Sequence, residues 1–234
     1  MKILIEESND TLIKFTLQDT FISYANALRR ILISEVPTVT IDLVEIEINN
    51  TSLPDEVISH RLGLIPLYTK RELLFRDECT CSDSCTECSV SISMNVSNPS
   101  DTPLVVTCKD LKADTDDIFI KSTPLICKLG TRQNLKVQCK AFKGIGKTHS
   151  KWSPVSVVGF EYDPSNKSRS TTYWKEREFD NEDIEDESNL IDEITEVKMS
   201  VEIVEGFGKP VDILKKGLEI MKKKFSNLRE ELVN

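Results

Sequence analysis

The sequence predicts an α+β fold in which a β-rich middle part lies between a first helix near the start of the chain and a long helix at its end. Three observations support this fold class. Short runs of alternating apolar and polar residues recur, one early segment has a helical apolar face, and the last segment carries a long apolar stripe. With 234 residues the chain can bury a substantial core, so we expect one domain or two closely joined lobes.

The first predicted elements are a hairpin and a helix. Residues 3–5 and 11–17 alternate in polarity around an Asn-Asp turn, which indicates a short antiparallel hairpin. The helix follows at once, with Asp19 or Thr20 as its cap and Pro37 beyond its end. Its apolar face is expected to hold Phe21, Ala25, Leu28 and Leu32. Its other face carries Asn26, Arg29 and Arg30.

The next segment predicts a long strand and a second helix. Residues 39–48 alternate in polarity, with a slip between Leu43 and Val44 that exchanges the two faces as a β-bulge does. Ser52 begins a helix with the spacing of a capping box, and Gly63 ends it.

A β-rich middle lobe follows. Four short β-like runs are separated by turn residues, at residues 90–96, 104–107, 135–139 and 155–160. The isolated cysteines of this part, Cys108, Cys127 and Cys139, are expected to be buried apolar residues on strands.

The end of the chain predicts a strand and a long helix. Residues 197–204 alternate, and Gly206 and Gly208 break the strand before a helix that begins near Pro210. Apolar residues recur along this helix at alternating spacings of three and four: Val211, Leu214, Leu218, Met221, Phe225, Leu228 and Leu232. Such a heptad stripe forms either a seam with a partner helix, which we favour, or part of the protein's own core.

Four of the seven cysteines, Cys79, Cys81, Cys85 and Cys88, fall within residues 79–88. Short Cys-x-Cys and Cys-x-x-Cys steps on a polar loop suit a tetrahedral zinc ion bound by four thiolates at about 2.3 Å. The spacing differs from that of the usual zinc ribbon. It therefore indicates that a metal is bound, but it does not identify the type of metal-binding module. We expect one zinc ion, with an iron–sulfur cluster or disulfides as the alternatives.

The charge of the chain is concentrated in one segment. The net charge is −9, and residues 176–196 hold eleven acids and one arginine, so this segment carries −10 and the remainder +1. We expect a solvated connector here, with an acidic docking patch as the lesser alternative. No concentrated basic stripe indicates direct DNA binding. We also expect no signal peptide and no transmembrane helix, hence a reducing intracellular location.

Residues 141–148 resemble a loose phosphate-binding loop, with Lys147 and Thr148 in the positions that contact phosphate. That mechanism needs a helix to begin at the lysine, but Trp152 and Pro154 interrupt such a helix within two turns. A phosphate-loop nucleotide-binding enzyme is therefore the alternative hypothesis. Neither histidine, His60 or His149, stands in a recognisable nucleophile context, so no catalytic residue is predicted.

Several motifs in one order resemble a known family. Residues 24–31 (Tyr-Ala-Asn-Ala-Leu-Arg-Arg-Ile), 35–37 (Glu-Val-Pro) and 53–66 are similar to the assembly subunit shared by cellular RNA polymerases, which includes the bacterial alpha subunit and its archaeal counterpart. The cysteine loop, residues 143–154 and residues 160–164 look specifically like the third-largest subunit of eukaryotic-type RNA polymerase II. The resemblance covers nearly the whole chain.

The resemblance implies a two-lobed polymerase alpha-like fold. Residues 1–45 and 193–234 would form a dimerisation lobe of antiparallel sheet plus helices, and residues 46–175 an inserted β-rich lobe with the metal loop at 79–88. Residues 176–192 would be the acidic connector.

The resemblance also implies a noncatalytic scaffold in DNA-templated transcription. The final and first helices would pack against a smaller alpha-like subunit, and this heterodimer would nucleate assembly with the second-largest subunit and two small zinc-binding subunits. Asn26, Arg29 and Arg30 match the part of the first helix that contacts the large subunit. DNA would be met only through the complex, and no membrane is involved. The location would be nuclear for a cellular protein, and host cytoplasm or virion for a viral one.

Overall fold

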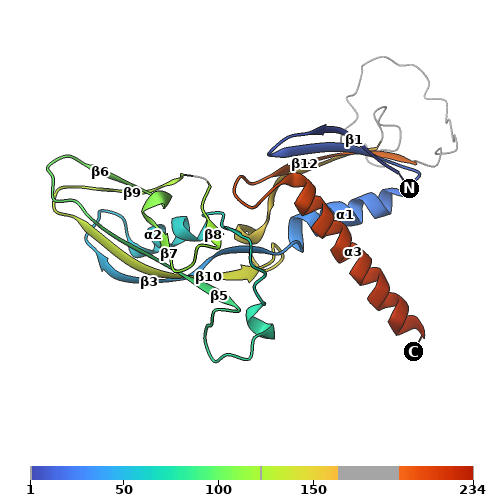
Figure 1. Ribbon diagram of the computed structural model, residues 1–234. Coiled ribbons are helices and arrows are strands. Elements are labelled where there is room, and N and C mark those ends of the chain that lie inside the picture. The colour runs from blue at the N-terminus through green and yellow to red at the C-terminus, as the bar shows by residue number, and fades with distance from the viewer. Residues whose placement is uncertain (1, 122, 163–194, 234) are drawn as a thin grey trace, which may run out of the picture.

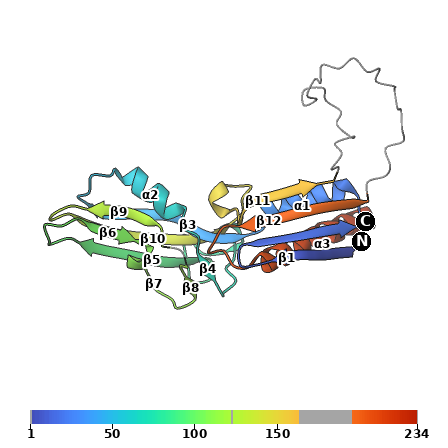
Figure 2. The same cartoon turned by 90° about the horizontal axis from the view of Figure 1, so that it is seen from above.

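The computed structural model describes residues 2–121, 123–162 and 195–233, which form two lobes joined along the long axis of the molecule (Figure 1). Both ends of the chain lie in the first lobe, and the second lobe is inserted between them in sequence (Figures 1 and 2). The predicted acidic connector at 176–192 lies outside the described residues. Within the described ranges, no helix has the length and apolar content needed to cross a membrane.

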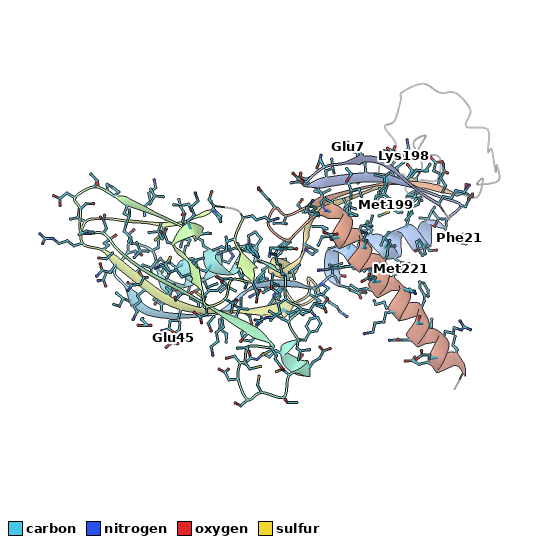
Figure 3. All side chains as sticks on the ribbon, in the orientation of Figure 1. Glu7, Phe21, Glu45, Lys198, Met199 and Met221 are labelled. Atoms are coloured by element: carbon cyan, nitrogen blue, oxygen red, sulfur yellow. The ribbon has the colours of Figure 1, made fainter. Side chains whose placement is uncertain are left out.

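The first lobe is a four-stranded antiparallel sheet with helices on one face (Figure 1). The strand order is β1 (Lys2–Ser8), β2 (Leu12–Gln18), β12 (Glu196–Ile203) and β11 (Val155–Glu161). Helix α1 (Ile22–Ser34) lies against β11, and helix α3 (Pro210–Val233) lies against β12 and β2. Alternation sorts the strand residues: Met199 points to the helices, whereas Glu7 and Lys198 lie on the open face (Figure 3).

The core of this lobe is built from both layers. The strands contribute Ile13, Phe15, Leu17, Val197, Met199 and Val201, and the helices contribute Ala25, Leu28, Leu32, Ile213, Leu214 and Met221. Phe15 is only 1% exposed, so its burial stabilises the lobe by about 1.5–3 kcal/mol. The predicted hairpin, the last strand and the start of the final helix at Pro210 are confirmed.

The second lobe is built on a sheet with the strand order β3 (Thr38–Asn49), β10 (Asn134–Gly144), β5 (Ser89–Ser97) and β7 (Lys112–Ala113). Two short strand pairs complete it: β4 (Tyr68–Thr69) with β8 (Ile118–Phe119), and β6 (Leu104–Thr107) with β9 (Leu125–Leu129). Helix α2 (Asp55–Gly63) packs on β3 and β9 through Ile58 and Leu62, both fully buried. Three short 3-10 turns lie between the strands: η1 (Arg76–Glu78), η2 (Cys108–Asp110) and η3 (Ser150–Trp152).

Both predicted helix starts are wrong in detail. Helix α1 has Phe21 at its N-cap without a side-chain hydrogen bond, and neither Asp19 nor Thr20 caps it. Phe21 itself is 66% exposed rather than buried, because it precedes the first turn that packs on the sheet. Helix α2 begins at Asp55 with Pro54 at its N-cap, so the capping box expected from Ser52 does not form. Its predicted end at Gly63 is confirmed.

Strand β3 contains bulges, but not where the sequence places one. Lys140 pairs with Leu43 and Ala141 pairs with Ile41, so Asp42 is an extra residue in β3. A second register shift leaves Glu47 unpaired in the same way. The bulge predicted between Leu43 and Val44 is therefore placed one residue too far toward the C-terminus. The first four residues of β3 are buried, whereas in its second half Val44 and Ile46 pack against the core and the residue between them is exposed.

The structure assigns two strands to lobes other than those that the sequence interpretation gave them. Strand β11, which falls within the span 46–175 assigned to the inserted lobe, pairs with β12 in the sheet of the first lobe. Strand β3, which the same interpretation cuts at residue 45, pairs with β10 along its whole length in the second lobe. Alternation alone marks a strand but does not say which strand it pairs with.

Candidate metal centre and partner-binding surfaces

The four clustered thiols meet in space. Their sulfur atoms all lie within 4.8 Å of one another. The separations are 3.5 Å for Cys79 and Cys85, 3.6 Å for Cys81 and Cys88, and 3.8 Å for Cys85 and Cys88. A tetrahedron with metal–sulfur bonds of about 2.3 Å has edges of about 3.8 Å. The thiols are therefore placed as four ligands of one metal ion require, and these distances are too long for disulfide bonds.

Backbone turns hold these sulfurs together. The carbonyl of Cys85 accepts hydrogen bonds from the N–H groups of Cys88 and Ser89, at 3.2 and 2.9 Å, and from the Ser89 hydroxyl. The pKa of Cys85 is lowered to about 7, first by the backbone N–H of Glu87 and then by the Cys79 thiol. Cys81 behaves oppositely, because hydrogen bonding with the thiols of Cys79 and Cys88 raises its pKa to about 12. N–H groups directed at a sulfur stabilise a thiolate, the form that binds metal.

The loop is fixed to strand β10 by contacts that sequence patterns did not indicate. Asp83 lies 2.8 Å from the Lys140 ammonium and 3.7 Å from Arg76. Lys143 donates to the carbonyl of Leu73, and its charge lies 4.7 Å from the centre of the Phe75 ring. The metal loop is thus a surface element whose inner end is tied to the sheet.

The heptad stripe of α3 has two different halves. Leu214 and Met221 are 6% and 3% exposed and belong to the core of the first lobe, and Val211 and Leu218 are partly buried against it. The three later members are open: Phe225 is 57% exposed, Leu228 51% and Leu232 78%. This part of α3 runs beyond the lobe without covering elements (Figure 1). Such a row of apolar side chains on a projecting helix is typical of a partner-binding surface.

The polar residues predicted on α1 lie together on its surface. Arg29 donates from Nε and Nη2 to the Asn26 side-chain oxygen, at 3.1 and 2.9 Å, and both residues are half-buried. Arg30 is exposed. Its neighbour Arg29 is held in a fixed orientation by its two hydrogen bonds to Asn26.

The predicted phosphate loop has another role. No α-helix begins at Lys147; the residues after it form only the three-residue turn η3. The backbone N–H of Lys147, which a phosphate would need, donates to the Ser34 carbonyl at 2.8 Å. The loop therefore connects the end of α1 to the second lobe, and the geometry that a phosphate requires is missing.

We call residues 144–154 the interlobe clamp, because they contact both lobes. The Trp152 indole donates to the Phe142 carbonyl at 3.3 Å, and the Trp152 carbonyl accepts from the Thr38 hydroxyl at 2.7 Å. Gly146 lies so near the Ile33 carbonyl that an added Cβ would be 2.4 Å from that oxygen. The glycine and lysine that suggested a nucleotide site are thus explained by close packing between lobes.

The three isolated cysteines are buried, as predicted. Cys127 and Cys139 lie on strands β9 and β10, but Cys108 lies in the turn η2, which corrects its expected place on a strand. Burial raises the pKa of Cys108 to about 11 and that of Cys139 to about 12. These thiols are neutral core residues, separate from the cluster of Cys79, Cys81, Cys85 and Cys88.

Comparison with known proteins identifies the family. The model for the RNA polymerase Rpb3/RpoA insert domain matches residues 44–156, which span the second lobe. The DNA-directed RNA polymerase II subunit RPB3 of Schizosaccharomyces pombe is 36% identical, over 98% of this chain and 86% of that protein. The chain belongs to the RPB3 family of RNA polymerase subunits. The predicted family and fold class are thereby confirmed.

Other members of the RPB3 family match shorter stretches. Subunit 3 of RNA polymerases II, IV and V of Arabidopsis thaliana is 46% identical over 70% of this chain, and the archaeal subunit Rpo3 of Pyrococcus furiosus is 36% identical over 75%. The chain spans 57% of the plant protein and 65% of the archaeal one. As a member of this family, the chain is a polymerase subunit that works within a complex, and nothing in these comparisons supports the nucleotide-binding alternative.

Proposed function

We propose that this chain is the noncatalytic assembly subunit of a DNA-directed RNA polymerase, and that it forms a heterodimer with a smaller alpha-like subunit. One observation carries the dimerisation proposal. A single continuous stripe on α3 is buried in the first lobe as far as Met221 and exposed from Phe225 onward. The first half anchors the helix, and the second half offers apolar area to another chain.

The size of this exposed stripe sets a requirement for the partner. Fully burying Phe225, Leu228 and Leu232 would contribute about 1.5–3 kcal/mol each. Association itself costs about 4–15 kcal/mol, a range that includes the sum for these three side chains, so they leave little surplus to hold a stable dimer. Phe21, which is 66% exposed at the start of α1, adds apolar surface in the same lobe (Figure 3). The partner must cover α1 as well as α3.

The remaining partners are proposed from the family and from the polar face of α1. Asn26, Arg29 and Arg30 are proposed to contact the second-largest subunit, because the Asn26 side chain fixes one guanidinium while Arg30 stays exposed. Two small zinc-binding subunits complete the assembly. The chain is proposed to act on DNA only through the complex, without binding it directly. The similarity to eukaryotic relatives supports a nuclear location.

The metal loop is proposed to hold one Zn²⁺ ion through Cys79, Cys81, Cys85 and Cys88. Four thiolates fill all positions of a tetrahedral ion, so the site is structural and leaves no open position for substrate. Its role is to close residues 79–88 into a fixed shape on the inserted lobe. The dimerisation lobe, with residues 1–45 and 193–234, and the inserted lobe, with residues 46–175, are proposed to carry these two separate tasks, with the revised places of β3 and β11 given above.

Co-purification with a matched control tests the dimer. We would express the chain with the smaller alpha-like subunit of the same polymerase and compare two double variants. Phe225→Glu with Leu228→Glu places charges in the seam and should abolish recovery of the heterodimer. Leu104→Glu with Leu125→Glu alters two similarly exposed apolar residues of the second lobe, at 38% and 45% exposure, and should leave recovery unchanged. Equal recovery with both variants would refute the proposed seam.

A further inference from the structure

A cleft of about 690 Å³ lies between the two lobes, and neither the sequence motifs nor the proposed contacts account for it. One wall is the outer face of α3 from Asp212 to Lys223. The other wall is the segment 67–73, which leads from β4 toward the metal loop. Pro37, Lys143 and Phe207 contribute to its inner end. The two walls, α3 and the chain that descends to the metal loop, can be located in Figure 1.

The lining of the cleft is predominantly basic. Six basic side chains line it, namely Lys70, Arg71, Lys143, Lys215, Lys216 and Lys223, against three acidic ones, Glu72, Asp212 and Glu219. The lining therefore carries a formal charge of 6 − 3 = +3 in a chain whose net charge is −9. A concave surface of one sign concentrates the field of its charges and selects a partner of the opposite sign.

Most of these cations lack a fixed counter-charge within the described part of the chain. No ion pair within 4.0 Å joins Lys70, Arg71 or the three cleft lysines of α3 to another described residue. Lys143 is occupied by the Leu73 carbonyl. Arg71 lacks an ion-pair partner as well, although its Nε is buried and has no hydrogen-bond partner among the described residues. The neighbouring Lys224, which lies outside the cleft, is by contrast paired with Glu35.

The mixed lining favours a peptide over a nucleic acid. A phosphate backbone carries a negative charge at every nucleotide and is repelled by wall carboxylates such as Glu72 and Glu219. A peptide carries its carboxylates singly, so each can lie near a lysine and away from an acid. The partly buried Tyr68 and Ile220 also line the cleft and suit apolar residues between those carboxylates.

We propose that this cleft binds an acidic, extended segment of another subunit in the polymerase complex. The carboxylates of that segment pair with Lys70 and Arg71 on one wall and with Lys215, Lys216 and Lys223 on the other. The bound segment joins the two lobes from outside, next to the exposed half of α3. This inference rests on the proposed function, because it requires that the chain works in a complex.

Zero-length cross-linking of the intact complex tests the contact directly. A carbodiimide joins an amine to a carboxylate only when the two groups touch, so it reports ion pairs. We would purify the complex through a tag on this chain, treat it with the carbodiimide and map the linked peptides by mass spectrometry. We expect Lys70, Lys215, Lys216 or Lys223 to be joined to Asp or Glu of another subunit. Cross-links only to acids of this chain, including residues 176–196, or none at these lysines, would overturn the proposal.

Charge reversal separates this proposal from the dimerisation proposal. Lys70→Glu with Lys215→Glu changes one lysine on each wall, and the matched control, Lys128→Glu with Lys198→Glu, changes one exposed lysine of each lobe outside the cleft. The cleft variant should retain the smaller alpha-like subunit and lose the cross-linked subunit about tenfold at low salt. The control should lose neither. Undiminished recovery with the cleft variant, or recovery that nuclease treatment abolishes, would overturn the acidic-segment proposal. If the unaltered chain recovers no polymerase subunit, the proposed function itself fails.

Discussion

Replacing Gly146 by alanine tests whether the interlobe clamp holds the two lobes together. The added Cβ would lie 2.4 Å from the Ile33 carbonyl oxygen and 3.3 Å from the Ser34 Cα. Both neighbours are backbone atoms at the end of α1, so they cannot rotate away as a flexible side chain would. The clamp must therefore move away from α1.

The expected cost follows from the two interactions that this movement affects. Overpacking of a tight contact costs about 1–3 kcal/mol. The hydrogen bond from the Lys147 N–H to the Ser34 carbonyl, 2.8 Å long, would also weaken, and it is worth about 0.5–1.5 kcal/mol. We therefore expect Gly146→Ala to lower the free energy of unfolding by about 2–4 kcal/mol.

Urea denaturation followed by tryptophan fluorescence measures this effect. Trp152 is 7% exposed inside the clamp, and replacing the second tryptophan, Trp174, by phenylalanine makes Trp152 the sole reporter. Gly63→Ala is the matched control, because its Cβ would lie 3.5 Å from the Ile41 carbonyl oxygen, which is an ordinary van der Waals distance. We expect the control to change stability by less than about 1 kcal/mol. If Gly146→Ala unfolds at the same urea concentration as the control, the close contact with α1 is not important for stability.

Four further predictions concern the cysteines and the clamp. Cys88→Ser should lose the bound metal, measured by mass spectrometry of the native protein, whereas Cys139→Ser, which changes a buried thiol outside the cluster, should retain it. Lowering the pH protonates the cluster thiolates, so metal affinity should fall as the solution becomes more acidic. Cys139 has a folded pKa raised by burial from 9.0 to about 12, so the unfolded chain loses this proton first and stability should fall as pH rises above 9.0. In Cys139→Val the fall between urea midpoints at about pH 8 and about pH 10 should be smaller, and an equal fall would contradict this assignment. Lys147→Ala should leave nucleotide affinity, measured by calorimetry with ATP, at the same negligible level as the unaltered chain, and measurable affinity that this change removes would revive the phosphate-loop hypothesis.

Local patterns were sufficient to predict most elements. The strand β12 and the stop at Gly206 and Gly208 follow from alternation and from backbone angles that suit glycine, with φ values of 114° and 131°. The four clustered cysteines were identifiable because these residues are close in sequence as well as in space. Both kinds of signal are short-range, so they need no knowledge of the tertiary structure.

Long-range contacts account for what the sequence did not predict. The pairing of β11 with β12 joins residues on either side of the acidic segment, and no periodicity specifies that partner. The basic cleft collects Lys70 and Lys215 from opposite lobes, so its charge exists only in the folded chain. The two halves of the α3 stripe share one heptad pattern, and only packing on the first sheet distinguishes Met221 from Phe225.

The interlobe clamp gives these surfaces a common physical basis. A scaffold that binds several subunits must present its binding surfaces at a fixed geometry, because flexibility between them adds an entropic cost to every assembly step. The metal loop belongs to the second lobe and the exposed half of α3 belongs to the first, so their relative position depends on the contact between lobes (Figure 1). Gly146 against α1 and Trp152 between Thr38 and Phe142 supply that contact. A loosened clamp should therefore weaken assembly even when the seam, the cleft and the metal ligands are all intact.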